Sequence, residues 1–119
     1  MTEALPWPTD LLLSPDRRSL TVSYDDGQVI TLAAEYLRVE SPSAEVQGHG
    51  PDQKQLVPGK ASVAIRSIEP IGNYAVRLVF DDGHDTGIYS WRYFLELHRS
   101  EANLRQAYLA ALSAAGLKR

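Results

Sequence analysis

Four side chains that could bind a metal ion crowd one short stretch of the sequence. Asp81, Asp82, His84 and Asp85 all fall within residues 81–85. Carboxylates and imidazole are ligands that divalent metals accept. Side chains at successive turn positions point in diverging directions, so an exposed turn with solvated acids is the simpler interpretation. A metal site that uses His84 with Asp85 is the alternative.

A second histidine stands in a long segment that has no periodicity. His49 lies between two glycines, within a stretch from residue 40 to residue 61 that is broken by proline and glycine. Segments of this length without regular structure are usually functional or mobile. His49 could fold back toward His84 and add a second nitrogen ligand, or it could be an ordinary loop histidine.

The chain offers no recognisable nucleophile. It has no cysteine, no serine in a Gly-x-Ser-x-Gly elbow and no Gly-x-x-x-x-Gly-Lys loop for phosphate. We therefore expect that this chain is not an enzyme. A small enzyme with an unrecognised site stays open as an alternative.

The composition narrows the class of protein. The 119 residues carry a formal net charge of −3, and 44% of them are hydrophobic. The lack of cysteine excludes disulfides, thiolate zinc sites and iron–sulfur clusters held by this chain. Scattered basic residues argue against nucleic-acid binding. No apolar run approaches the ~20 residues of a membrane span, and the acidic, proline-broken start is unlike a signal peptide. We expect a cytoplasmic protein that binds neither nucleic acid nor membrane.

Two similar units position these side chains. Alternating apolar residues predict strands over residues 19–24 and 74–80, and each strand is followed by Asp-Asp-Gly. Asp-Gly is typical of a type I′ hairpin turn. Return strands over 28–32 and 86–89 lead into short helices over 33–39 and 90–97.

Two further elements complete the predicted fold. Val63, Ile65 and Ile68 indicate another strand, and a second helix capped by Ser100 runs to Gly116. We predict an α+β fold in one domain over residues 1–119, an antiparallel sheet built from two hairpin–helix units plus a C-terminal helix.

Aromatic residues gather in the second unit. Most of them should belong to the core, because rings supply large buried area, and some could form an exposed docking surface. The group is Tyr74, Tyr89, Trp91, Tyr93 and Phe94.

The second unit carries a resemblance to a known family. Residues 72–91, Gly-Asn-Tyr-Ala-Val-Arg-Leu-Val-Phe-Asp-Asp-Gly-His-Asp-Thr-Gly-Ile-Tyr-Ser-Trp, resemble the signature of the DUF971 family, the γ-butyrobetaine hydroxylase-like N-terminal domain. Residues 20–27 and the Tyr36-Leu37-Arg38 run fit as well. The resemblance covers residues 6–98 and leaves the helix over 100–116 outside. Within the family, the chain resembles the stand-alone, bacterial-type form that lacks the zinc cysteines.

The resemblance implies a metal site that this chain has largely lost. In the hydroxylases the domain looks like a zinc module with three cysteines and one histidine. The histidine falls on His84, and the thiolate positions fall on Ser41, Ser43 and Val46. Serine hydroxyls are poor zinc ligands. We therefore expect this chain to bind no cofactor, although metal binding is a property attached to the family as a whole.

The expected function is a docking role. We predict a non-catalytic accessory or protein-interaction module, and the resemblance implies a link to iron–sulfur or oxygenase-related processes. A metal-binding protein that uses His84, His49 and nearby carboxylates is the alternative. The sequence identifies no particular partner and no oligomeric state.

The degenerate site also predicts a contact in space. We expect His84 to lie within a hydrogen bond, or one bridging water, of residues 41–46. The candidate partner surface lies beside that contact and includes His49, His84, Tyr89 and Trp91. A partly exposed hydrogen bond is worth only about 1 kcal/mol, so His84→Ala should cost little stability.

Overall fold

The computed structural model describes residues 6–48, 50 and 53–119 and has the predicted α+β architecture. Two antiparallel sheets of three strands each have the strand orders β1-β2-β3 and β4-β5-β6. The prediction of a single sheet is therefore wrong in this detail. The elements are β1 (Pro8–Leu13), β2 (Ser19–Tyr24), β3 (Val29–Ala33), α1 (Ala34–Val39), α2 (Ala44–Gln47), β4 (Ile65–Ile71), β5 (Ala75–Phe80), β6 (Ile88–Ser90), α3 (Trp91–Arg99) and α4 (Glu101–Ala114).

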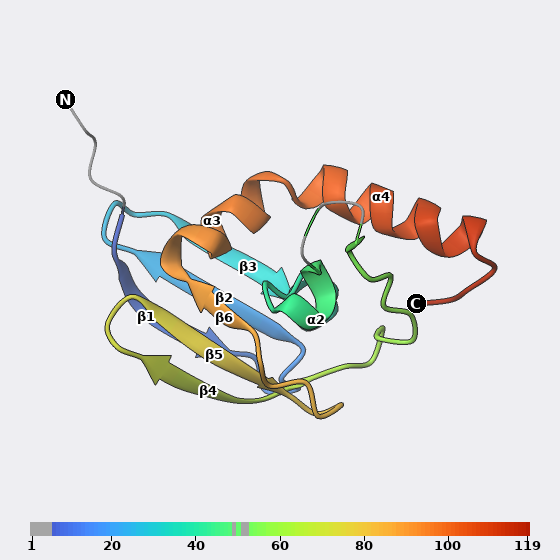
Figure 1. The fold of residues 1–119 in the computed structure, drawn as a ribbon. Helices are drawn as coiled ribbons and strands as arrows, with labels where there is room; N and C mark the ends of the chain where they lie inside the picture. The colour runs from blue at the N-terminus through green and yellow to red at the C-terminus, as the bar shows by residue number, and fades with distance from the viewer. Residues whose placement is uncertain (1–5, 49, 51–52) are drawn as a thin grey trace.

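The core lies between the sheets and the helices α1 and α3 (Figure 1). The central strand of each sheet turns its alternate apolar residues inward, as its sequence predicts. In β2 these residues are Leu20, Val22 and Tyr24, which are 0 to 3% exposed. In β5 they are Val76, Leu78 and Phe80, at 0 to 2% exposed.

The two Asp-Asp-Gly turns share one geometry, which differs from the predicted type I′ turn. Gly27 and Gly83 have φ of 91° and 92°, whereas the aspartates before them are not in the left-handed region. In each turn the glycine N–H donates to the carbonyl three residues earlier, Tyr24 or Phe80. A turn followed by one left-handed glycine is a type I turn with a glycine bulge, so only the glycine position needs positive φ.

Two of the three predicted helix caps are present in the structure. Ser90 accepts a hydrogen bond from the backbone N–H of Tyr93 and begins α3. Gly116, with φ of 69°, follows the end of α4, where Leu117 N–H donates to Leu112 O. Ser100 makes no side-chain cap bond, so α3 and α4 meet at a bend without the predicted cap.

Helix α4 is attached at the edge of the domain. Only Tyr108 and Leu112 of its residues are buried, and they pack with Val39 at the end of α1. The buried carboxylate of Glu35 accepts hydrogen bonds from Arg105 and Arg119. The ion pairs of these two arginines with Glu35 and a small apolar cluster thus hold α4 and the residues after it in place.

The described part of the segment after α1 includes the short helix α2, which the sequence did not predict. Farther along, Leu56 and Val57 pack against the apolar cluster that α4 forms with Val39. No helix in the described part of the chain is long and apolar enough to cross a membrane.

Candidate functional site

His84 lies in a buried hydrogen-bonded cluster at the end of β5. His84 is 6% exposed, and its Nε2 atom is 2.8 Å from the hydroxyl of Ser41. The Ser43 hydroxyl is 3.4 Å from the same nitrogen. The segment after α1 and the turn after β5 therefore meet at one hydrogen bond, which confirms the predicted contact.

The other ring nitrogen of His84 faces a carboxylate. Nδ1 lies 3.3 Å from Glu45 Oε2 on α2. With an acceptor at Nδ1, the neutral ring carries its proton there, and Nε2 accepts from the Ser41 hydroxyl. Burial, together with the positive charge of Arg38, lowers the pKa of His84 below its usual value, although Glu45 and Asp82 act in the opposite direction. The ring is therefore neutral near pH 7.

Ser41, His84 and Glu45 follow the order of a serine nucleophile, its base and the acid that orients the base. Ser41, however, is 0% exposed. A Cβ placed on Gly87 would lie 2.6 Å from the Ser41 oxygen, so the hydroxyl is closely packed on that side. A substrate has no access to this oxygen in the folded chain. The cluster joins two segments of the chain, and its serine hydroxyl is closed off by packing.

The residues that stand where the family resemblance places the zinc ligands do not fit a zinc ion. Ser41 and Ser43 contribute hydroxyls, and the Ser41 hydroxyl occupies the histidine nitrogen that would bind the metal. Val46 is buried and has no donor atom. Zinc in proteins takes thiolate, imidazole or carboxylate ligands. Within the described ranges, no group of three or more His, Cys, Asp and Glu side chains is placed to hold a metal.

Of the other two proposed ligands, only Asp85 lies within the described residues, and it does not join the cluster. Asp85 is exposed, and His49 lies outside the described residues.

An ion-pair network that the sequence analysis missed surrounds the turn. Asp82 accepts from Arg38 at 2.8 Å, from Lys60 at 2.6 Å and from the backbone N–H of His84 at 3.1 Å. Although burial acts to raise it, these hydrogen bonds lower the pKa of Asp82 to about 2. Arg38 and Asp82 are 44 positions apart in the sequence. The only sequence signal for this ion pair was that Arg38 belongs to the Tyr-Leu-Arg run of the family resemblance.

The structure does not bring together the described members of the predicted partner surface, His84, Tyr89 and Trp91, and His49 lies outside the described residues. Tyr89 is 0% exposed, and its hydroxyl donates to Leu37 O inside the core. Trp91 donates through Nε1 to Asn73 O, before the start of β5, whereas His84 follows the other end of that strand. At about 3.3 Å per residue, a strand of this length spans roughly 20 Å. Trp91 and His84 therefore cannot belong to one small surface.

Trp91 instead belongs to an aromatic end of the molecule. We define the aromatic end as Trp7, Tyr74 and Trp91. Trp7 is 50% exposed and Tyr74 is 57% exposed. Hydrogen bonds tie the three together: Trp91 N–H donates to Tyr74 O, Tyr24 OH donates to Trp91 O, and Asp25, next to Tyr24, accepts from Trp7 N–H.

The start of β1, the β2–β3 and β4–β5 turns and the start of α3 gather at the left of Figure 1, where this aromatic end lies. Figure 1 thus places the aromatic end away from the His84 turn.

Two short antiparallel sheets, covered by α1 and α3, and a buried serine–histidine cluster that joins the segment after α1 to the turn after β5 define a small α+β domain. The sequence model described as "Gamma-butyrobetaine hydroxylase-like, N-terminal" matches residues 11–95. The chain belongs to this family. Among curated proteins, the comparison finds no significant match.

Solved structures support the family assignment. Two proteins with NMR solution structures are 50% and 44% identical to this chain, with TM-scores of 0.83 and 0.80. The first match covers 100% of this chain and 90% of that chain, and the second covers 98% and 91%. A crystal structure of a DUF971-family protein of unknown function from Acidithiobacillus ferrooxidans is 37% identical, with a TM-score of 0.64, and covers 76% of this chain and 91% of that chain.

Proposed function

We propose that this protein is a non-catalytic interaction module that docks onto a cytoplasmic protein through its aromatic end. One observation carries the proposal: Trp7 and Tyr74 are half-exposed at the same end of the molecule, next to Trp91. Trp and Tyr are the residues most enriched among those that dominate protein–protein binding energy. Trp91 packs on Phe94 and is hydrogen-bonded through its indole, so the position of this ring is fixed before a partner arrives.

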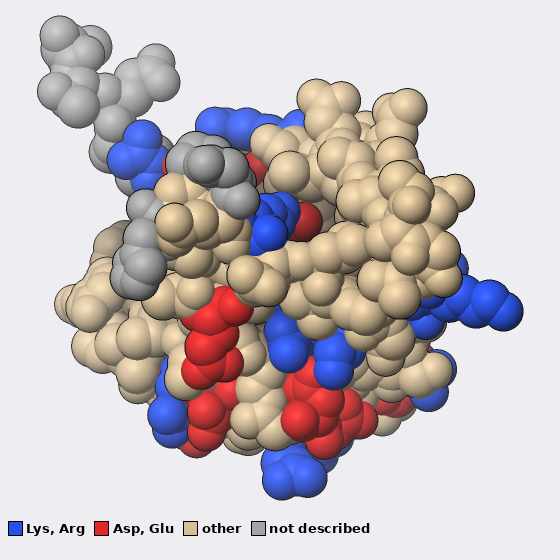
Figure 2. Space-filling model, turned by 45° about the vertical axis from the view of Figure 1, so that its right-hand side comes forward, with Lys and Arg blue, Asp and Glu red and all other residues tan. Residues whose placement is uncertain are grey.

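The family and the charge distribution support the same role. The family is described by its place at the N-terminus of a hydroxylase-like protein. We infer that a domain of that kind acts through contact with another domain or protein. On the face shown in Figure 2, acidic and basic side chains lie next to one another and do not form a patch of one sign. That pattern favours a protein partner over nucleic acid.

The experiment compares two variants in affinity capture from cells of the source organism, after crosslinking. The first, Trp7→Ala with Tyr74→Ala, removes the exposed rings of the aromatic end. The matched control, Leu109→Ala, removes an apolar side chain that is 40% exposed on α4. We expect the same protein to be captured by the wild type and by the control, and to be lost with the double variant. Thermal melts of all three proteins verify that they are equally folded.

Capture that survives in the double variant at the wild-type level would contradict the proposal. Loss of capture in both variants would place the docking surface elsewhere and would contradict it as well.

A further inference from the structure

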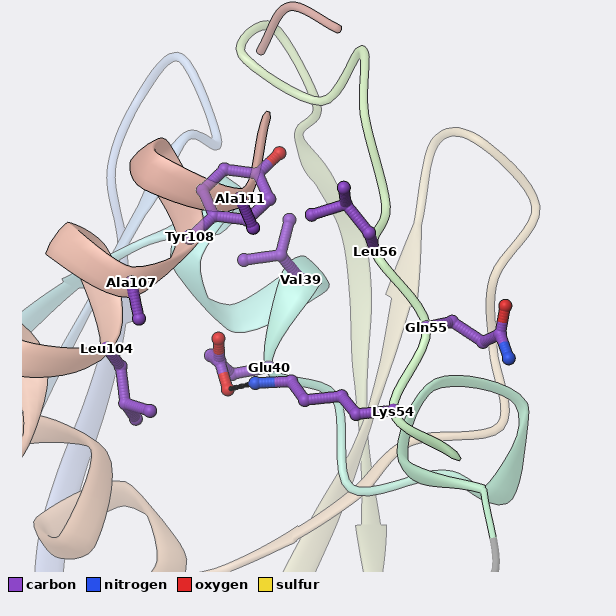
Figure 3. A pocket seen from close by; sticks show the side chains of 9 residues that line it. All are labelled: Val39, Glu40, Lys54, Gln55, Leu56, Leu104, Ala107, Tyr108 and Ala111. Carbon is purple, nitrogen blue, oxygen red and sulfur yellow. Dashed lines mark hydrogen bonds and ion pairs between the residues drawn. The ribbon is translucent and has the colours of Figure 1, made fainter. Parts of the chain in front are cut away.

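A pocket separate from the serine–histidine cluster and from the aromatic end lies between α4, the end of α1 and residues 54–56 (Figure 3). Its volume is about 230 Å³. Figure 2 shows the hollow on this face, with basic and acidic atoms at its bottom. Most of its wall is apolar, contributed by Val39, Leu56, Leu104, Ala107, Tyr108 and Ala111.

One end of the pocket is closed by an ion pair between Glu40 and Lys54. Lys54 Nζ is 2.5 Å from Glu40 Oε1, and Figure 3 shows both side chains reaching toward each other at the edge of the apolar wall. The two partners are very unequal in burial. The side chain of Glu40 is 5% exposed, whereas that of Lys54 is 35% exposed.

The carboxylate is the fixed member of the pair. Glu40 ends α1, and its backbone carbonyl accepts a hydrogen bond from Tyr93 OH at 2.6 Å. Lys54 reaches the carboxylate from a segment without regular structure, on a long side chain whose charge is well hydrated when it is released. A buried carboxylate without a cation is strongly unfavourable, whereas a lysine that returns to water is not. A ligand that enters this end of the pocket can therefore displace Lys54 only if it brings a positive charge of its own.

We propose that this pocket binds a small primary alkylamine in its ammonium form. The ammonium takes the place of Lys54 Nζ on Glu40, and the alkyl chain lies against Leu56, Leu104 and Tyr108. An apolar cavity of roughly 150 Å³ is enough to bind benzene, so this pocket has room for a chain of about six carbons. The inference is independent of the proposed docking role, because it uses none of the residues of the aromatic end.

The test is an NMR titration of the full, isotope-labelled chain at pH 7 with n-hexylamine, n-hexanol and hexanoate as probes. We expect hexylamine to shift the methyl signals of Leu56, Leu104, Ala107 and Ala111 and to bind at least tenfold more tightly than the other two probes. Lys54→Ala should increase hexylamine affinity several-fold, because it removes the internal competitor. Lys60→Ala is the matched control, since that lysine pairs with Asp82 instead, and it should leave the affinity unchanged.

Glu40→Gln should weaken hexylamine binding at least tenfold. If that variant does not fold, the affinity increase expected of Lys54→Ala, set against the unchanged affinity expected of Lys60→Ala, still decides the question. The proposal is overturned if hexanoate binds as tightly as hexylamine, if Lys54→Ala weakens amine binding, or if no pocket methyl group shifts.

Discussion

Removal of the Ser41 hydroxyl tests whether the serine–histidine cluster stabilises the fold. In Ser41→Ala, Nε2 of the buried His84 loses its 2.8 Å partner and keeps only the Ser43 hydroxyl at 3.4 Å, which is near the limit of a hydrogen bond. A buried acceptor left without a good partner costs about 1–3 kcal/mol. We expect the free energy of unfolding to fall by about 2 kcal/mol, which corresponds to roughly 5–10 °C in Tm for a domain of this size.

A double-mutant cycle with His84→Ala isolates the hydrogen bond. Because His84 is 6% exposed, this substitution removes a buried ring and should cost about 3–5 kcal/mol, far more than the sequence predicted for a partly exposed histidine. The coupling energy between Ser41→Ala and His84→Ala should be about 1–2 kcal/mol.

Urea unfolding at pH 7.5, followed by circular dichroism, supplies all the free energies, and Ser43→Ala is the matched control with an expected loss below about 1 kcal/mol. Equal, small losses for both serines, with coupling under about 0.3 kcal/mol, would show that the cluster does not stabilise the fold.

Other measurements test the turn, the packing and the metal chemistry. The pKa of Asp82 is lowered from 3.8 to about 2, so its contribution to stability is present above pH 4 and is lost as the pH falls toward 2; Asp82→Asn should flatten the stability profile in that window by up to about 2 kcal/mol. Gly27→Val and Gly83→Val should each cost about 1–2 kcal/mol and shift Tm similarly, because both positions have positive φ and open space around the added Cβ; unequal shifts would contradict this account. Gly87→Ala should lower the unfolding free energy by about 1–3 kcal/mol in the same urea assay, since its methyl group would overlap Ser41 and Tyr89. The purified chain should be folded without zinc, and EDTA should leave its Tm unchanged; elemental analysis with about one zinc per chain, and unfolding on chelation, would refute the exclusion of zinc.

Local patterns in the sequence predicted most of the elements. The alternation of Val76, Leu78 and Phe80 fixed the buried face of β5, and Ser90 marked the start of α3 through its hydroxyl. These features depend on neighbours in the chain, so a sequence can express them. The His84–Ser41 contact was also predicted, but through the family resemblance, since the two residues are 43 positions apart.

Features set by tertiary packing could not be predicted in the same way. The division into two sheets depends on which strand edges pair, and alternation within a strand does not specify its neighbours. The sequence analysis grouped Trp91 with His84 on one surface, but the antiparallel return of β6 carries Trp91 back to the start of β5, away from His84. The Glu40–Lys54 pair joins two residues with no shared motif, and nothing local marks them as partners.

The joint between the segment after α1 and the turn after β5 is made from two hydroxyls and an imidazole. Thiolates at such positions can be oxidised by peroxide to sulfenic acid and then to disulfides or higher acids. Serine hydroxyls undergo none of these reactions, and the chain has no cysteine elsewhere. This joint is therefore insensitive to oxidants that act on thiols, whereas the same oxidants would modify the sulfur atoms of a thiolate version of the joint.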